Sequence, residues 1–194
     1  MIKAVIFDWG GVLSPCNNRA AAKHFAEKYG VIEEDIYKDM DSLEDEFNVS
    51  NEDNSAYYRE IGSKYNIKPE EVKSVLNNVP VWDVFSYVKT LKGKVRLLVL
   101  SNQMKPRTDA IKNDNDLSFF DNTFFSNEVG IMKPDKRIFQ LVLDKSDLKA
   151  DECMFIDDCE RNLIPARELG FNTILFQNYN QLKEDLKKLG INND

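Results

Sequence analysis

The sequence is short of the features that mark membrane, secreted and cysteine-metal proteins. No run approaches the ~20 consecutive apolar residues that a membrane-spanning helix needs, and the apolar start ends at Asp8 without the cleavage site of a signal peptide. The three cysteines form neither a C-x-x-C pair nor a zinc-binding spacing. An odd cysteine count without a secretory segment is typical of a reducing compartment. We therefore expect a soluble, cytoplasmic protein with no membrane partner.

Basic residues and histidine are also scarce. The chain has 33 acidic against 26 basic residues, a net charge of −7, and this balance argues against nucleic acid as a partner. His24 is the only histidine; it lies in an Ala-rich helical pattern and is expected to have a surface or packing role, so no Ser-His-Asp triad is available. No nucleophile elbow, P-loop or G-x-G-x-x-G fingerprint is present.

Five short apolar runs suit strands that are buried on both faces of a parallel sheet. The chain has 194 residues, 42% of them hydrophobic, which is enough for one domain with a modest insertion. Helical patterns alternate with the later runs, and this alternation predicts a doubly wound α/β fold. The runs are residues 4–7, 95–100, 123–125, 153–156 and 173–176, and the later helical patterns are residues 135–143, 162–169 and 179–189.

The alternation is interrupted early in the chain. Between about residues 17 and 83 no convincing strand appears, and helical patterns occupy residues 20–29, 52–65 and 69–77. We interpret this stretch as a small helical lobe inserted after the first strand. The predicted division is a Rossmann-like α/β core formed by residues 1–14 and 84–194, with a helical insertion at residues 15–83.

Polar side chains follow four of the predicted strands. Asp8 ends the first, Ser101 and Asn102 end the second, Lys133 follows the third, and Asp157 and Asp158 end the fourth. Ligands of open α/β sheets bind beyond the carboxyl ends of the strands. One crevice is therefore expected to hold three carboxylates, a hydroxyl, an amide and an ammonium group.

This set of groups suits the hydrolysis of a phosphate monoester. Mg²⁺ prefers hard oxygen ligands, and Asp8 and Asp158 are the natural pair. A carboxylate oxygen of Asp8 is then able to attack phosphorus and form an aspartyl-phosphate. Lys133 would neutralise the phosphoryl group, while the Ser101 hydroxyl and the Asn102 amide would donate hydrogen bonds to its oxygens.

Four segments resemble, in order, the four motifs of the haloacid dehalogenase superfamily. They are residues 6–13 (IFDWGGVL), 99–102 (VLSN), 130–139 (GIMKPDKRIF) and 155–162 (FIDDCERN). The helical insertion stands where that family places its cap, and the details are most similar to sugar-1-phosphate phosphatases and to the phosphatase domain of soluble epoxide hydrolases.

The resemblance implies a role for each motif residue. Asp8 is the nucleophile and a metal ligand, the backbone carbonyl of Gly10 is a second ligand, and Asp158 is a third. Asp157 acts on the metal through water or holds Lys133. Ser101, Asn102 and Lys133 bind phosphate, and Asn162 either supports the site or is a solvated helix residue. The implied cofactor is Mg²⁺ and the implied partner is a small phosphorylated metabolite bound by a monomer or homodimer.

The first motif departs from the family pattern, D-x-D, because it reads Asp8-Trp9-Gly10. The second aspartate normally protonates the leaving oxygen and activates water, and losing such a group typically costs ~10²–10⁴-fold in rate. Three interpretations stay open. The enzyme favours leaving groups that need little protonation, or a residue of the insertion supplies the acid, for example one in residues 39–46, although a solvated helix face is the simpler view of that stretch. Alternatively, the protein is a weak or inactive relative that binds phosphorylated ligands or a protein.

Two related chemistries fit the sequence less well. A haloacid dehalogenase proper needs no metal and lacks the paired aspartates that this chain keeps at residues 157–158. A phospho-accepting receiver domain carries its acidic pair at the first strand and has no helical insertion. The identity of the substrate and the insertion residues that contact it cannot be predicted from these motifs.

Overall fold

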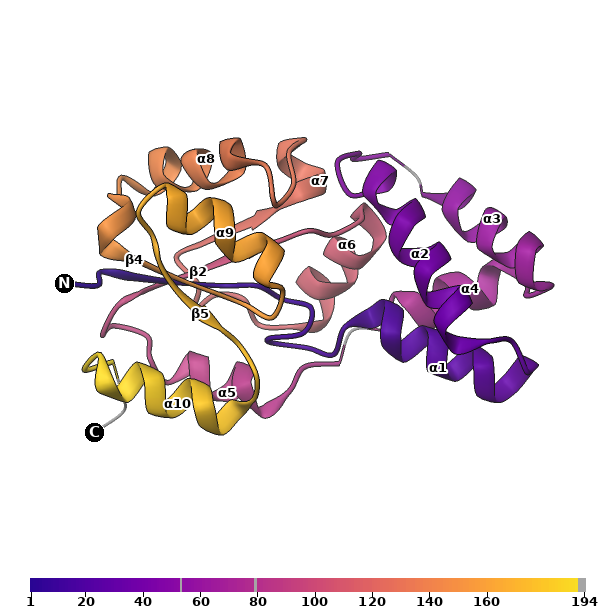
Figure 1. Cartoon of the computed structure of the whole chain (residues 1–194), viewed down its shortest axis with the longest axis horizontal. Helices are drawn as coiled ribbons and strands as arrows, with labels where there is room; N and C mark the ends of the chain where they lie inside the picture. The colour runs from indigo at the N-terminus through magenta and orange to yellow at the C-terminus, as the bar shows by residue number, and fades with distance from the viewer. Residues whose placement is uncertain (53, 79, 192–194) are drawn as a thin grey trace.

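The computed structural model describes residues 1–52, 54–78 and 80–191. It consists of a parallel sheet with helices on both faces, and of a group of helices that lies beyond one end of the sheet (Figure 1). This α/β architecture is the predicted fold.

The sheet has five strands in the order β3-β2-β1-β4-β5, all parallel. Their bounds are Ala4–Phe7 for β1, Arg96–Ser101 for β2, Asn122–Phe125 for β3, Cys153–Asp157 for β4 and Asn172–Leu175 for β5. β1 lies at the centre and pairs with β2 on one side and β4 on the other. The order of strands therefore reverses at β1, which is the position where α/β sheets form their binding crevice.

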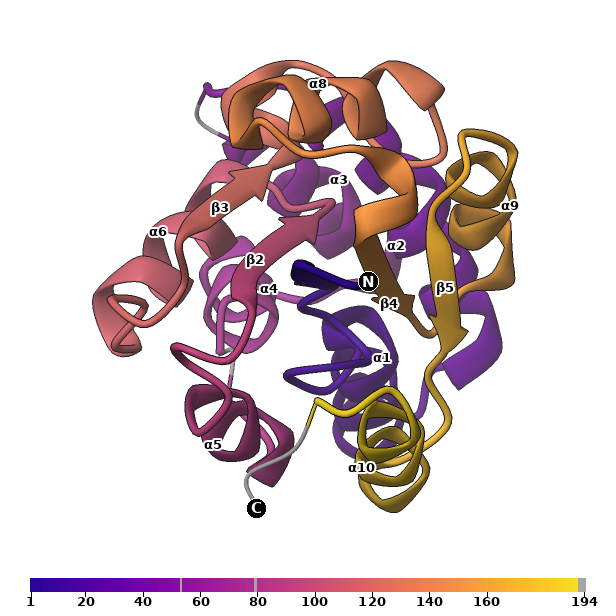
Figure 2. The same cartoon turned by 90° about the vertical axis from the view of Figure 1, so that its left-hand side faces the viewer.

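Strand side chains alternate between two hydrophobic layers, because successive residues of a strand point to opposite faces. Val5 and Phe7 of β1 pack against α5 (Asp83–Lys89) and α10 (Tyr179–Lys188), while Ala4 and Ile6 pack against α8 (Lys136–Ser146) and α9 (Glu160–Glu168). Figure 2 looks along the sheet and shows these helices on its two sides. The short elements α6 (Lys105–Asp114), α7 (Ser126–Val129) and η1 (Ala150–Glu152) complete the core.

The inserted helices form a hydrophobic cluster of their own. They are α1 (Asn17–Tyr29), α2 (Glu33–Phe47), α3 (Ser55–Tyr65) and α4 (Pro69–Leu76). Phe25, Ile36, Tyr57 and Val72 lie in this cluster, and Met104 of the core joins it. Where the chain enters and leaves the insertion, the two segments are linked by a hydrogen bond from Trp82 N–H to the Leu13 carbonyl (2.8 Å).

All five predicted strands and the later helices are present, with ends displaced by a few residues at most. In the 52–65 pattern α3 begins at Ser55, and residue 53 lies outside the described residues. α5 and α6 were not among the predicted helices, and α2 was anticipated only as a helix face at residues 39–46. α6 gave no apolar periodicity, because Ile111 is its one strongly apolar side chain in the buried core. The pattern at residues 135–143 is α8, which begins at Lys136 with Asp135 as its N-cap, whose carboxylate accepts from Arg137 N–H.

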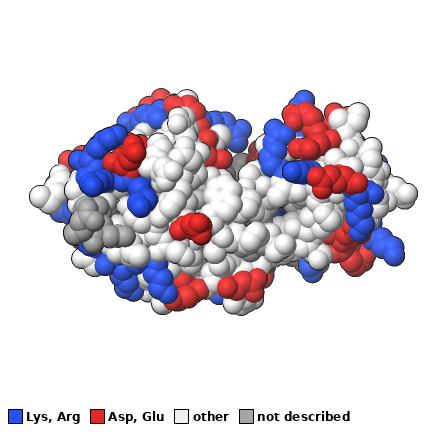
Figure 3. All heavy atoms as spheres, turned by 90° about the horizontal axis from the view of Figure 1, so that it is seen from below, with Lys and Arg blue, Asp and Glu red and all other residues white. Residues whose placement is uncertain are grey.

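The face shown in Figure 3 mixes acidic and basic side chains and is notched between the two lobes. It offers no continuous basic track of the kind that a nucleic-acid backbone requires. None of the helices in the described ranges is long and apolar enough to span a lipid bilayer.

Candidate active site

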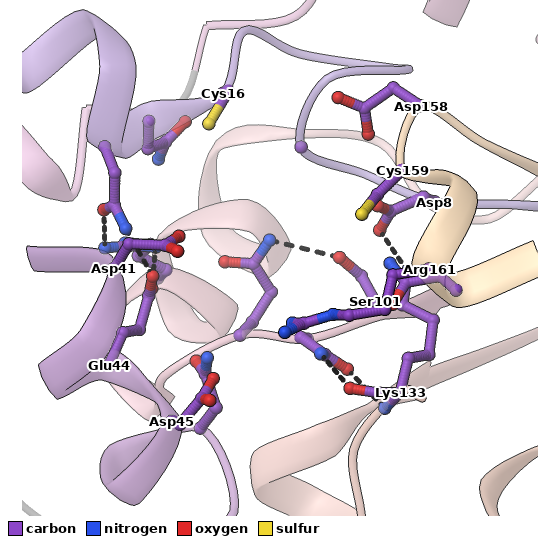
Figure 4. Close-up of a pocket in the computed structure, with 18 of the residues that line it drawn as sticks. Asp8, Cys16, Asp41, Glu44, Asp45, Ser101, Lys133, Asp158, Cys159 and Arg161 are labelled. Carbon is purple, nitrogen blue, oxygen red and sulfur yellow. Dashed lines mark hydrogen bonds and ion pairs between the residues drawn. The ribbon is translucent and has the colours of Figure 1, made fainter. Parts of the chain in front are cut away.

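A polar cavity of about 570 Å³ lies between the carboxyl ends of the central strands and the inserted helices. Its core side holds the predicted residues Asp8, Ser101, Asn102, Lys133 and Asp158, together with Gly10 and Asn162. Figure 4 shows Asp8, Ser101 and Lys133 on one side of this cavity, facing Asp41, Glu44 and Asp45 from α2. The fold therefore brings together at one edge the residues that were predicted from four separate strand ends.

Asp8 is held in place immediately beyond β1. Its Oδ1 accepts a hydrogen bond from the N–H of Trp9 (2.7 Å) and lies 3.0 Å from the Nζ of Lys133. The other oxygen, Oδ2, takes no part in these two contacts. Burial raises the pKa of Asp8 to about 7, and although Lys133 opposes this rise, the neighbouring charges of Asp157 and Asp158 add to it. A cation at this position would stabilise the ionised form.

Lys133 is almost completely buried, at 1% exposure, and bridges two carboxylates. Its Nζ lies 2.6 Å from Asp157 Oδ2 as well as 3.0 Å from Asp8 Oδ1. Burial alone would lower the pKa of this ammonium group, but the charges of Asp157 and Asp8 outweigh burial and raise it. Lys133 is therefore expected to be a cation that is shielded from solvent, where electrostatic interactions are strong.

Asp157 is fully buried, and both of its oxygens are engaged by the protein. Oδ2 contacts Lys133, Oδ1 accepts from the N–H of Cys159 (2.8 Å), and the Asn162 amide donates to both oxygens (3.1 Å each). Holding Lys133 was one of the two roles expected of Asp157. Asn162 is a buried partner of this carboxylate, as expected of a supporting residue, and its solvated interpretation is wrong.

The donor set of the site fits a magnesium ion. Asp8, Asp157 and Asp158 each bring a carboxylate oxygen to within 4.8 Å of one another. Hard oxygen donors of this kind suit Mg²⁺. Burial, followed by the charge of Asp157, raises the pKa of Asp158, so this carboxyl also gains from a nearby cation.

Gly11 makes room for the Asp158 carboxylate. A Cβ atom at Gly11 would lie 2.2 Å from Asp158 Oδ2, and the residue has a φ of +83°, which side chains rarely adopt. The absence of a side chain at Gly11 is therefore a requirement of the site. The motif resemblance gave Gly11 no role, although the glycine pair at residues 10–11 is visible in the sequence.

Ser101 and Asn102 lie where β2 ends, as predicted, and have different surroundings. A hydrogen bond from Ser101 lowers the pKa of Asp8, so the hydroxyl lies beside the expected nucleophile. The Asn102 side chain exchanges two hydrogen bonds with the backbone of Lys133: its amide donates to the carbonyl (2.8 Å) and its oxygen accepts from the N–H (2.9 Å). Asn102 thus fixes the Lys133 loop, a role that its sequence position did not reveal.

The acidic stretch of residues 39–46 is for the most part the solvated helix face that was expected, since Asp41, Asp45 and Glu46 are exposed on α2, but Glu44 is an exception. Glu44 is buried and pairs with Arg107 of α6, while Asn18 of α1 donates to Glu44 Oε2 (2.5 Å) and accepts from Arg107 Nη2 (2.9 Å). Asp41 and Asp45 line the cavity. Tyr37 and the C-cap Asn48 also line it, and their spacing of three to four residues from Asp41 and Asp45 is the sequence signal that these side chains share one face of α2.

His24 has the surface position expected of it, and Trp9 and Cys159 have structural surroundings. Trp9 is fully buried and packs edge-on against Phe85. The His24 imidazole is half exposed, 3.8 Å from Glu71. Cys159 is the N-cap of α9. Arg161 is exposed on α9 and lines the cavity.

Comparison with known proteins places this geometry in a family. A model of haloacid dehalogenase-like hydrolases matches residues 2–170. The chain is 26% identical over 176 residues to sesquiterpene phosphatase astK from Aspergillus oryzae, covering 87% of this chain and 86% of that one. It is 31% identical over 120 residues to glyceraldehyde 3-phosphate phosphatase from Methanocaldococcus jannaschii, covering 56% and 53%.

Other curated relatives are much longer proteins. The chain matches bifunctional epoxide hydrolase 2 from Mus musculus with 39% identity over 70 residues, 36% of this chain and 13% of the relative. It spans 21% of drimenol cyclase drtB from Aspergillus calidoustus. These relatives share part of their length with the chain.

Solved structures share the whole fold. A protein from Porphyromonas gingivalis, described as a predicted HAD-like (haloacid dehalogenase-like) family hydrolase, superposes with a TM-score of 0.78 and 25% identity, covering 97% of this chain and 98% of that one. An HAD family enzyme from Bacteroides thetaiotaomicron, in complex with magnesium and inorganic phosphate, superposes with a TM-score of 0.74 and 21% identity, covering 94% and 99%.

Proposed function

The chain belongs to the haloacid dehalogenase-like hydrolase family, and we propose that it is a magnesium-dependent phosphatase that hydrolyses a small phosphate monoester through an aspartyl-phosphate on Asp8. One observation carries the proposal. A buried cation, Lys133, lies between Asp8 and Asp157 at the head of a polar cavity, with Asp158 alongside. This is a set of groups for holding a dianion next to a carboxylate. The phosphatases among its relatives support the same reaction.

The proposed metal ligands are Asp8, Asp158 and the backbone carbonyl of Gly10. Asp157, whose oxygens are already engaged, acts through a water molecule and by holding Lys133. When bound, Mg²⁺ would screen the repulsion between the substrate dianion and the carboxylate and would neutralise charge on the transferring oxygens.

In the first step Asp8 acts as the nucleophile. Its Oδ2 is the oxygen outside the contacts with Trp9 and Lys133, so it is the one available to attack phosphorus. A bond forms between Oδ2 and phosphorus, and the ester bond between phosphorus and the leaving oxygen breaks. The leaving oxygen keeps the electron pair and takes up a proton from solvent. Lys133 and the Ser101 hydroxyl hold the phosphoryl oxygens during this transfer.

In the second step water attacks the phosphorus of the acyl phosphate. The bond between phosphorus and Oδ2 breaks, the Asp8 carboxylate is restored with its electron pair, and inorganic phosphate leaves. Because Gly10 offers no carboxyl group, the proton of this water passes to solvent or to a phosphoryl oxygen of the acyl phosphate. We therefore expect slow turnover of esters with basic leaving oxygens and faster turnover of aryl or acyl phosphates.

Gly10 also supports a second candidate function. A chain without the usual acid-base group is suited to binding phosphorylated ligands, or a protein, with weak turnover or none. The two candidates share the binding site and differ in whether Asp8 becomes phosphorylated. A phosphorylated Asp8 that reacts with hydroxylamine would establish the enzyme.

The test is phosphate release from p-nitrophenyl phosphate and a panel of sugar phosphates, with and without Mg²⁺. Asp8→Asn should lower turnover about 10³-fold or more, since it removes the nucleophile. Asp151→Asn is the matched control, because Asp151 is an exposed carboxylate before the amino end of β4. Absence of turnover by the folded protein on every substrate would refute the phosphatase and favour the binding protein.

A small phosphorylated metabolite is the proposed partner, and a cytoplasmic location is part of the same proposal. The three cysteines, Cys16, Cys153 and Cys159, are all unpaired, which suits a reducing compartment. The state of assembly, monomer or homodimer, stays a prediction.

A further inference from the structure

Gln103 lies between the end of β2 and the start of α6, and its side chain is held beside the expected nucleophile. Its backbone N–H donates to Ser126 Oγ (2.9 Å), and its side-chain Nε2 donates to Ser101 Oγ (3.2 Å), a bond that Figure 4 marks with a dashed line ending on Ser101. Ser101 in turn hydrogen-bonds to Asp8. The Gln103 amide is therefore fixed in a short chain of hydrogen bonds that ends at Asp8.

The amide nitrogen borders the space that Gly10 leaves open. Gly10 and Gln103 both line the cavity, and a Cβ atom at Gly10 would lie 3.9 Å from Gln103 Nε2. Apart from the chain neighbours of Gly10, no other heavy atom of the described residues lies within 4 Å of that Cβ position. The open space is therefore bounded by a hydrogen-bond donor, at the position where the first motif lacks its second carboxyl group.

This donor has a hydrogen to spare. A glutamine Nε2 carries two hydrogens, and Ser101 Oγ accepts one of them. Within residues 1–52, 54–78 and 80–191, the second hydrogen meets no acceptor. Gln103 is 6% exposed, so the amide is shielded from bulk water, where a hydrogen bond to a developing charge is strong.

Other side-chain donors on the core side of the cavity are already used by the protein. These are the Asn102 amide, which donates to the Lys133 carbonyl, the Asn162 amide, which donates to Asp157, and the Arg107 guanidinium, which pairs with Glu44. Lys133 and Ser101 adjoin Asp8 and are assigned to the phosphoryl oxygens. Arg161 lines the cavity but is exposed. Gln103 is therefore the buried side-chain donor, among the described core residues of this wall, that is left for the leaving group.

The direction of attack brings the leaving oxygen toward this donor. In phosphoryl transfer the attacking oxygen, the phosphorus and the leaving oxygen lie roughly in line. Asp8 stands at the strand ends, so an oxygen that leaves opposite Asp8 departs into the cavity. Ser101 contacts Asp8, and Gln103 lies one hydrogen bond beyond Ser101 along the cavity wall.

We propose that Gln103 is a catalytic residue, whose Nε2–H donates a hydrogen bond to the leaving oxygen in the space beside Gly10. The proposal rests on the proposed phosphatase function and adds a residue to its first step. The bond between phosphorus and the leaving oxygen breaks, the oxygen keeps the electron pair, and the amide stabilises the negative charge that develops there. Gln103 transfers no proton, and solvent supplies the proton that the leaving oxygen takes up.

The test varies the leaving group and keeps the phosphoryl group constant. The leaving oxygens of p-nitrophenyl, phenyl and benzyl phosphate are increasingly basic, and kcat/KM reports the steps up to their departure. Gln103→Met keeps the length of the side chain and removes the donor. It should lower kcat/KM about 10²-fold for benzyl phosphate, less for phenyl phosphate, and less than about threefold for p-nitrophenyl phosphate, whose charge is delocalised.

A matched control and a second variant accompany this series. Gln140→Met makes the same substitution at an exposed residue of α8 that does not line the cavity, and should leave all three values unchanged. If Gln103→Met does not fold, Gln103→Asn draws the amide back from the leaving oxygen and should show the same dependence on the leaving group.

A double variant separates direct contact from support of Ser101. If Gln103 only held Ser101 in place, Gln103→Met would lower kcat/KM equally for every leaving group and would cause no further loss in a Ser101→Ala background. We expect instead that Gln103→Met still lowers kcat/KM for benzyl phosphate about tenfold or more in that background. In a Gly10→Asp background its effect should shrink, because the new carboxyl group serves the same oxygen.

The outcomes distinguish this proposal from the proposed function. Equal losses for the three substrates, or no loss, would overturn the role of Gln103 and leave the phosphatase intact. Absence of p-nitrophenyl phosphate turnover by the native protein, together with no phosphorylation of Asp8, would refute the phosphatase and this role with it.

Discussion

Arg107 of α6 and Glu44 of α2 form a buried ion pair that ties the inserted helices to the sheet core, across 63 residues of sequence. Asn18 of α1 hydrogen-bonds to both partners. Burial raises the pKa of Glu44, while the Arg107 charge and the Asn18 hydrogen bond oppose the rise. The position of the insertion over the cavity therefore depends on the buried Glu44 carboxylate, whose charge would destabilise the fold if its partner Arg107 were removed.

Removing one partner of this pair should be far worse than removing both. Arg107→Met is expected to lower the free energy of unfolding by about 3–5 kcal/mol, since Glu44 would remain buried and unpaired. The double variant Arg107→Met with Glu44→Leu should recover most of that loss. Urea unfolding of the single and double variants measures the coupling, and additive losses would show that the two side chains act independently.

Gly11→Ala should damage the metal site as well as the backbone. The new Cβ would collide with the Asp158 carboxylate at 2.2 Å, so we expect weaker Mg²⁺ binding and at least a tenfold loss of turnover. Gly93→Ala is the control: Gly93 has a similar φ of +85° but nothing within 4 Å of its Cβ position. Both variants should lose about 1 kcal/mol or more of stability from the backbone, and only Gly11→Ala should lose Mg²⁺ affinity, as measured by calorimetry.

Lys133 should matter to stability as much as to activity. Lys133→Met leaves the carboxylates of Asp8 and Asp157 facing each other in a buried site, and we expect a loss of about 3–5 kcal/mol. Adding Asp157→Asn should return part of the stability but no turnover, because the cation that holds the phosphoryl group is still missing. Recovery of turnover in the double variant would contradict the role given to Lys133.

Metal binding should depend on pH through Asp8. Its pKa in the folded, metal-free protein is about 7, so below that value Mg²⁺ must displace a proton, and its affinity should fall by up to about tenfold per pH unit. Above pH 7 the affinity should level off. Calorimetry between about pH 6 and pH 8 measures this slope, and Asp8→Asn should abolish it.

The raised pKa of Asp8 also determines how the stability of the metal-free protein changes with pH. The unfolded chain ionises this carboxyl near 3.8 and the folded chain near 7, so between these values the folded state binds more protons. The stability of the metal-free protein should therefore fall as the pH rises through this window. Thermal unfolding in the presence of a chelator should show a decline that is reduced in Asp8→Asn.

Gly10→Asp should restore the missing acid-base group. The position is open, since a Cβ there meets only the Gln103 amide nitrogen at 3.9 Å and the φ lies outside the left-handed region. We expect turnover of alkyl phosphates to rise about 10²-fold or more, with a much smaller change for p-nitrophenyl phosphate, whose leaving group needs little protonation. An equal rise for both substrates would point to a change in binding instead of proton transfer.

The sequence by itself determined the core and the strand-end residues. Continuous apolar runs are what buried parallel strands require, so β1 and the other four strands could be located from residue type alone. Because parallel strands share one carboxyl edge, the residues that follow them must lie near one another. This rule is enough to predict that Asp8, Ser101, Lys133 and Asp158 line a common crevice.

Only the tertiary structure decided what faces that edge. Glu44, Arg107 and Gln103 carry no motif, and a charged residue on a helix has the same local pattern whether it faces solvent or a cavity. α6 was missed because its helix depends on packing, with almost no apolar periodicity of its own. The partners of Asn102 and Asp157 are set by contacts between segments far apart in the chain. It is these long-range contacts, absent from any local pattern, that shape the cavity beside Asp8.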